Sequence, residues 1–113
     1  MFEKDKGNLL AILDSCSKIL KFTSDISNAE AFFDDERTFD AVLMNFVIIG
    51  ESVARLSTEI LEKESQVPWG QIKGFRNIVA HDYFGVDAEE VWQIIQNHLP
   101  ELESQIENIL KNS

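Results

Sequence analysis

The residues best suited to chemistry lie in one short segment, residues 74–85, which reads GFRNIVAHDYFG. Arg76 offers a permanently charged, planar set of donors that matches a phosphate, and His81 can exchange protons near neutral pH. Asn77 and Tyr83 add an amide and a phenol hydroxyl. An anion-binding donor and a proton-transfer group are the two tools that phosphodiester cleavage needs without a metal ion.

The spacing of these four residues predicts how they would lie on a helix. On a continuous helix Arg76 and Tyr83, seven residues apart, share a face, and Asn77 and His81, four apart, form the adjacent stripe. All four can then converge on one cleft. Spacing alone is a weak signal, because Arg and His on a short helix often form surface ion pairs. Asn77 can bond the backbone near a helix start, and Tyr83 can be a core aromatic.

The distribution of charge points to the same segment. Ten Lys and Arg against 20 Asp and Glu give a net charge of -10, so the broad basic surface of a general nucleic-acid binder is missing. Residues 67–81 contain no acidic residue but include Lys73 and Arg76. A negatively charged ligand is therefore expected to bind more favourably there than at the acidic surface elsewhere. Glu51, farther up the chain, could orient Arg76 or simply be solvated.

Apolar residues at helical spacing predict the long elements that position this segment. One stripe places a helix over about residues 8–23, and a second pattern covers residues 39–61 without a proline. The middle of the second pattern, residues 42–49, is apolar on nearly every side, so we expect neighbours to cover more than one of its faces. Residues 47–49 also suit a buried strand, but the regular pattern on both sides favours a helix.

Proline and glycine predict the helix boundaries around residues 74–85. Pro68 can open a helical turn, and Gly74 is expected to interrupt it. Residues 75–84 then form a second short helical segment, which Gly85 ends as a left-handed cap.

Capping residues predict the remaining helices. Asn28 suits the start of a single helical turn, and Asp87 with Glu90 forms a capping box for a helix that carries Trp92. Pro100 marks a kink or restart before the last helix. The chain is therefore predicted to be all-α, one domain over residues 1–113, and an up-and-down bundle of four to five helices.

The sequence lacks the residues that several other classes of function require. Cys16 is the single cysteine, so it has no disulfide partner and is expected to pack in the core. His81 and His98 are 17 residues apart without a HExxH spacing, so no metal site is predicted. There is no glycine-rich phosphate loop or GxSxG elbow, and no cofactor is expected. The longest apolar run, residues 46–49, is far too short to span a membrane, and a cytoplasmic protein is expected.

Arg76, His81 and Tyr83 also form the pattern RxxxxHxY. Together with the surrounding PW, GFRN, HDYFGVD and, earlier, IGES sequences, this pattern closely resembles the HepT-like branch of the HEPN ribonuclease superfamily. The resemblance covers residues 32–106, and the combination is far more specific than RxxxxH alone.

The resemblance implies a homodimeric endoribonuclease toxin, paired with an MNT-type nucleotidyltransferase as antitoxin. Arg76 and His81 of both protomers would line one cleft and cleave RNA without a metal, by attack of the ribose 2'-hydroxyl on the adjacent phosphate. His81 would serve as general acid or base, Arg76 would stabilise the transition state, and Asn77 and Glu51 would support them. Tyr83 would be the hydroxyl to which the antitoxin transfers AMP, which blocks the cleft.

Two other classes of function remain open from the sequence. The chain could be a non-catalytic nucleotide-binding partner module of a minimal nucleotidyltransferase, which the net charge of -10 favours. It could also be a bare helical dimerisation scaffold. A binding module would keep its nucleotide affinity when His81 is replaced and would have no cleavage to lose.

Overall fold

The computed structural model describes residues 1–112, and within them it is all-α, as the sequence predicts. There are seven α-helices in this range, against the four to five predicted, and one 3-10 turn. The same range contains no strand, which rules out the strand interpretation of residues 47–49. The elements, in chain order, are α1 (Glu3–Phe22), α2 (Ala29–Asp34), α3 (Glu36–Ala54), α4 (Thr58–Lys63), α5 (Trp69–His81), η1 (Tyr83–Gly85), α6 (Ala88–Asn97) and α7 (Leu99–Lys111).

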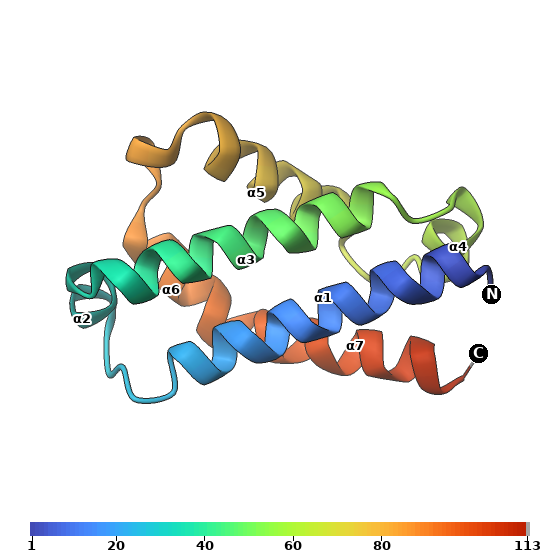
Figure 1. Cartoon of the computed structure of the whole chain (residues 1–113), viewed down its shortest axis with the longest axis horizontal. Coiled ribbons are helices and arrows are strands. Elements are labelled where there is room, and N and C mark those ends of the chain that lie inside the picture. The colour runs from blue at the N-terminus through green and yellow to red at the C-terminus, as the bar shows by residue number, and fades with distance from the viewer. Residues whose placement is uncertain (113) are drawn as a thin grey trace.

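Helix α3 lies at the centre of the bundle (Figure 1). It packs against α1 on one side and α5 on the other, and α7 packs on α1. The short α2 fills the end of the bundle against α3 and α6. Helix α5, which carries Arg76 and His81, packs chiefly on α3. It therefore lies at the outer edge of the molecule, where one of its sides stays accessible.

The central position of α3 explains its composition. Phe39, Val42, Phe46 and Ile49 are buried between the neighbouring helices, so the expectation that more than one face is covered is confirmed. Cys16 is also fully buried, as expected, and burial together with the nearby Glu103 carboxylate raises the pKa of its thiol to about 12. No helix among residues 1–112 is long and apolar enough to cross a membrane.

The pattern over residues 39–61 is not one helix, which corrects the sequence-based expectation. Helix α3 ends at Ala54, and Ser57 starts α4 by accepting a hydrogen bond from the backbone N–H of Ile60 at 3.3 Å. The buried Asp5 carboxylate accepts hydrogen bonds from the Ser57 backbone N–H at 2.8 Å and from its hydroxyl at 2.6 Å. This contact with α1 holds the chain in a turn where the apolar spacing alone would continue the helix.

Most predicted boundaries elsewhere are confirmed. Asn28 caps α2 by accepting from the Ala31 N–H at 2.8 Å, and Pro100 lies in the first turn of α7. Asp87 caps α6, but it accepts from the Glu89 N–H at 2.9 Å, two residues on, rather than from Glu90 as a capping box would require.

Candidate functional site

Helix α5 carries Arg76, Asn77 and His81 on one continuous element. It runs from Trp69 to His81 straight through Gly74, so the predicted interruption at Gly74 is wrong. A helical glycine costs about 1 kcal/mol relative to alanine. Packing against α3 offsets this cost, since Phe75 and Phe46 form a T-shaped pair with a centroid distance of 5.1 Å.

Gly50 allows α5 to approach α3 closely at Arg76. A Cβ on Gly50 would lie well inside 3.0 Å of the Arg76 Cβ and Cγ, and 3.5 Å from its Cα. The absence of a side chain at position 50 thus lets the stem of Arg76 lie directly on the α3 backbone. The next residue, Glu51, then lies within reach of the Arg76 guanidinium.

Replacing Gly50 with Ala is expected to lower the free energy of unfolding by about 1–3 kcal/mol, the usual cost of overpacking a tight contact. Gly74→Ala is the matched control, because nothing lies within 4 Å of its Cβ position. The control should be neutral or more stable by about 1 kcal/mol through helix propensity. Urea denaturation measures both, and a Gly50→Ala protein with the wild-type midpoint would contradict the close-approach argument.

Arg76 is positioned by Glu51, which is one of the two roles that the sequence left open for this glutamate. The Arg76 Nη1 donates a hydrogen bond to the Glu51 Oε1, and the pair forms a salt bridge. The Arg76 side chain is 19% exposed and Glu51 is 43% exposed. The Nε of Arg76 is buried without a hydrogen-bond partner among the described residues. An unpaired buried donor costs about 1–3 kcal/mol, so a guanidinium that turned to bind an anion would recover part of that cost.

His81 and Asn77 lie on the outer side of α5. Both side chains are exposed, and no described residue makes a hydrogen bond or ion pair with either. Five residues separate Arg76 from His81, which is about 140° around a helix. Arg76 therefore faces α3, while His81 faces away from it and is exposed to solvent.

Tyr83 does not lie on the helix of Arg76, which corrects the assumption of a continuous helix. Helix α5 ends at His81, and Tyr83 begins the 3-10 turn η1, where it is 41% exposed. Its hydroxyl donates a hydrogen bond to the Asp40 carboxylate on α3. This hydrogen bond raises the pKa of Tyr83, with smaller contributions from partial burial and from the Asp40 and Glu36 charges.

Gly85 is not a left-handed cap, since no residue in the described range has a positive φ. A side chain at this position would instead collide with the Asp82 carboxylate, which folds back over the turn. Glycine avoids this contact, although the exposed Asp82 side chain could also turn away from a small residue at this position.

The structure pairs Arg76 with Glu51 and Tyr83 with Asp40, and it does not gather all four predicted residues in one cleft of a single chain. Glu51 and Asp40 are 11 residues apart on α3, which corresponds to about 16 Å along the helix. Asp40 was not among the residues singled out from sequence. The signal that could have found it is its i, i+4, i+8 and i+11 spacing with Met44, Ile48 and Glu51, which places all four on one stripe of α3.

Comparison with known proteins identifies the family. The model of the family described as "Ribonuclease HepT-like" matches residues 12–109. The chain belongs to this family. The predicted enzyme class, a ribonuclease, is thereby confirmed, together with the resemblance on which it was based.

Related proteins cover nearly the whole chain. "Putative RNase TTE0752" of Caldanaerobacter subterraneus subsp. tengcongensis is 39% identical over 100 residues, 88% of each chain. "Putative RNase MJ0127" of Methanocaldococcus jannaschii is 36% identical over 113 residues, 99% of this chain and 93% of the relative. "Probable ribonuclease HepT" of Thermococcus cleftensis is 29% identical over 111 residues, 98% of this chain and 100% of the relative. No solved structure gives a significant match.

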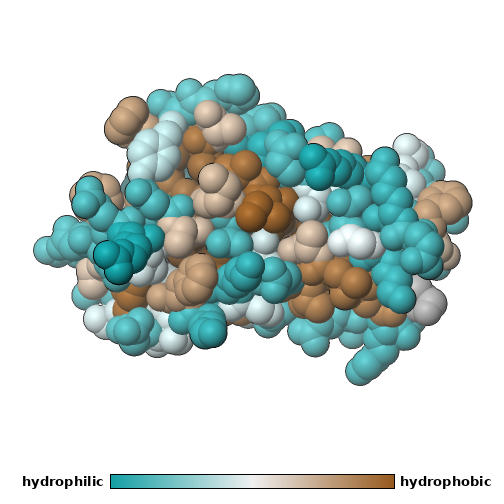
Figure 2. Space-filling view, viewed as in Figure 1, coloured by the Kyte–Doolittle hydropathy of each residue, from teal (hydrophilic) through white to brown (hydrophobic). Residues whose placement is uncertain are grey.

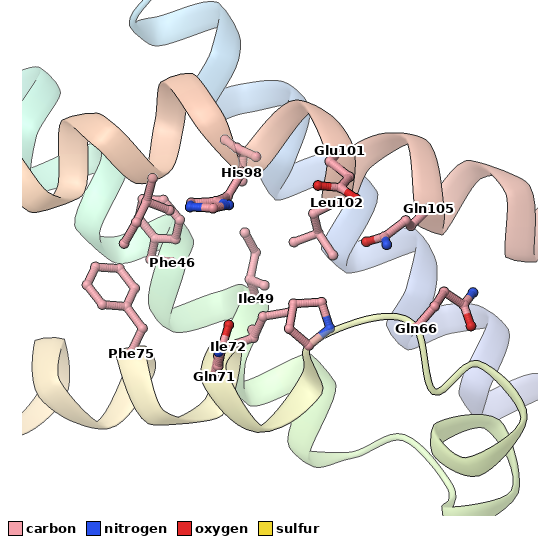
Figure 3. Close-up of a pocket in the computed structure, with 13 residues that line it drawn as sticks. Phe46, Ile49, Gln66, Gln71, Ile72, Phe75, His98, Glu101, Leu102 and Gln105 are labelled. Atoms are coloured by element: carbon pink, nitrogen blue, oxygen red, sulfur yellow. The ribbon is translucent and has the colours of Figure 1, made fainter.

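This HepT-like chain also contains an apolar cavity of about 320 Å³, separate from the RxxxxHxY residues. Phe46 and Ile49 of α3 and Ile72 and Phe75 of α5 form its walls, and His98 points into it from the junction of α6 and α7 (Figure 3). None of Arg76, Asn77, His81 or Tyr83 lines it. Over residues 1–112, His, Cys, Asp and Glu form no group of three or more that could hold a metal ion.

Proposed function

We propose that this chain is a metal-independent endoribonuclease toxin of a toxin-antitoxin pair. It cleaves RNA by attack of a ribose 2'-hydroxyl on the adjacent phosphate, which leaves a cyclic phosphate end. The observation that carries the proposal is the arrangement on α5, where Arg76 is held by Glu51 and His81 is exposed at the end of the same helix. The acid-free stretch of residues 67–81 keeps this helix open to a phosphate.

The two residues have complementary roles in this reaction. His81 takes the proton from the 2'-hydroxyl or gives one to the departing 5'-oxygen, and Arg76 stabilises the extra negative charge on the phosphorane-like transition state. Exposed Asn77 lies beside His81 on α5 and positions the phosphate. A single His81 cannot be both acid and base in the same step, so two copies of the chain would supply one imidazole for each role.

Exposed apolar side chains next to this helix support a homodimer. Met44 and Ile48 are 59% and 39% exposed, and they lie on the α3 stripe between the contacts to Tyr83 and Arg76. Ile78 of α5 and Phe84 of η1 are 51% and 98% exposed. Apolar surface is visible where α5 lies beside α3 (Figure 2). A two-fold partner on this face would cover these residues and bring two Arg76–His81 pairs together.

Ile48→Asp is expected to convert the dimer into a monomer, because the introduced carboxylate would be desolvated at the two-fold interface. Leu10→Asp is the matched control, since Leu10 is also exposed, at 47%, but lies on α1. Light scattering after size-exclusion chromatography measures the mass of each variant. A dimeric Ile48→Asp protein, or a monomeric wild type at micromolar concentration, would contradict the dimer model.

Regulation is proposed to act on Tyr83. An MNT-type nucleotidyltransferase antitoxin would transfer AMP to its hydroxyl, adding bulk and a negative charge two residues after His81. Partial exposure of Tyr83 supports this role, because the hydroxyl lies within reach of a second protein.

The deciding experiment is cleavage of total cellular RNA by purified protein in excess EDTA. The proposal expects cleavage that EDTA leaves unchanged, with 2',3'-cyclic phosphate ends on the products. Loss of cleavage in EDTA would overturn the metal-free mechanism. Absence of any cleavage, with Tyr83 shown by mass to be unmodified and nucleotide binding retained, would favour the partner-module alternative, which the net charge of -10 supports.

A further inference from the structure

The hydrogen bond between Tyr83 and Asp40 joins two residues that are 43 positions apart. The phenol hydroxyl of Tyr83 is the donor and the Asp40 carboxylate is the acceptor. Asp40 is exposed on α3, and Tyr83 is 41% exposed. An incoming group can therefore approach the phenol while its hydroxyl proton remains hydrogen-bonded to the Asp40 carboxylate. The fold thus places a proton acceptor directly on the hydroxyl that the proposed function makes an AMP acceptor.

Tyr83 needs such an acceptor to become a nucleophile. The Asp40 hydrogen bond is the main cause that raises the pKa of Tyr83, with partial burial and the charges of Asp40 and Glu36 adding to it. The phenol therefore keeps its proton throughout the neutral range, and a protonated phenol is a weak nucleophile. The proton must leave as the new bond forms, and the Asp40 oxygen already accepts it in a hydrogen bond.

We propose that Asp40 is the general base for adenylylation of Tyr83. The inference rests on the proposed function, in which Tyr83 is the residue modified. The Tyr83 oxygen forms a bond to the α-phosphorus of ATP as the bond from that phosphorus to the bridging oxygen breaks. Pyrophosphate leaves with the electron pair, and the phenolic proton moves to Asp40, which later releases it to solvent.

The charges on this end of α3 favour the same assignment. Glu36 and Asp40 both lie near the phenol, and a second negative group would be repelled there. When Asp40 takes the proton it becomes neutral at the moment when the phosphodiester brings in one negative charge. The local charge is then the same before and after the transfer, which a base located elsewhere would not achieve.

The test compares two variants, each of which keeps the shape of the side chain that it replaces but lacks its negative charge. Asp40→Asn keeps an oxygen that can accept the Tyr83 hydrogen bond but cannot take the proton, and Glu36→Gln removes the other nearby charge. Full-length protein is incubated with an MNT-type nucleotidyltransferase and Mg·ATP, and AMP addition is followed by intact mass. Asp40→Asn is expected to lower the rate constant by about 100-fold or more, with KM for the toxin unchanged, and Glu36→Gln should stay near wild type.

A pH profile separates proton transfer from simple anchoring. The charged groups near the phenol are Glu36 and Asp40 of α3, with His81 and Asp82 in its own segment. All except Asp40 are common to wild type and Asp40→Asn, so their effects on the rate cancel in the ratio of the two rates. That ratio should fall as the pH rises toward the pKa of Tyr83, because the phenol then ionises without a base.

The outcomes distinguish this inference from the proposed function. Equal rates for wild type and Asp40→Asn, or a rate ratio independent of pH, would overturn Asp40 as the base. Failure of wild type to gain AMP, or equal modification of Tyr83→Phe, would instead remove Tyr83 as the acceptor and with it the proposed regulation.

Discussion

His81→Ala is expected to lower the rate constant for RNA cleavage by about 100- to 10,000-fold, the usual contribution of one general acid or base. The fold should be unaffected, because the His81 side chain is exposed and makes no hydrogen bond or ion pair with a described residue. Substitutions at such surface positions usually change the free energy of unfolding by less than about 0.5 kcal/mol. Initial rates on a labelled RNA in EDTA, with urea denaturation beside them, measure both quantities.

His98→Ala is the matched control for this prediction. His98 is the other histidine of the chain, and it is also exposed. It lies at the junction of α6 and α7 and not on α5, and its ring points into the apolar cavity. The cleavage rate of His98→Ala should stay within about threefold of wild type, because none of Arg76, Asn77, His81 and Tyr83 lines the cavity that His98 enters. Equal losses in both variants would show that the effect of His81→Ala is general and would remove His81 from the chemistry.

The fold could be read from sequence wherever apolar periodicity decided the outcome. The stripes of α1 and α3, the Asn28 cap and the restart at Pro100 are local signals, and the structure confirms them. The errors occur where a tertiary contact competes with a local preference. Packing of Phe75 on Phe46 carries α5 through Gly74, and the Asp5 carboxylate holds the turn at Ser57.

The candidate site was likewise predictable where its residues are neighbours in the sequence, and not where they meet only through tertiary contacts. Arg76, His81 and Tyr83 stand close together in the chain, so their motif is visible without a structure. The helical spacing of Asp40 places it on the same stripe of α3 as Glu51, but its partner Tyr83 is 43 residues away, and the spacing does not indicate that the two residues pair. The tight contact of Gly50 with Arg76 is likewise a property of two helices, visible only once α3 and α5 are packed together.

Arg76→Lys is expected to lower the cleavage rate constant by about 100-fold or more. Lysine keeps the positive charge, but it loses the planar fork that can bind Glu51 and a phosphate oxygen together. KM for RNA should change little, because an interaction that strengthens only in the transition state affects the rate constant. Arg55→Lys is the control, since Arg55 is an exposed arginine just beyond the end of α3, and its variant should cleave at the wild-type rate.

Glu51 can then be tested as a residue that acts through Arg76. Glu51→Gln keeps an oxygen that accepts from the Arg76 Nη1 but loses the charge that orients the guanidinium, so its rate should lie between wild type and Arg76→Lys. If Glu51 works only by positioning Arg76, the double variant is no slower than Arg76→Lys alone, because the orienting group has nothing left to orient. Independent, multiplicative losses would instead mean that the Glu51 carboxylate contacts the RNA or the reacting groups directly.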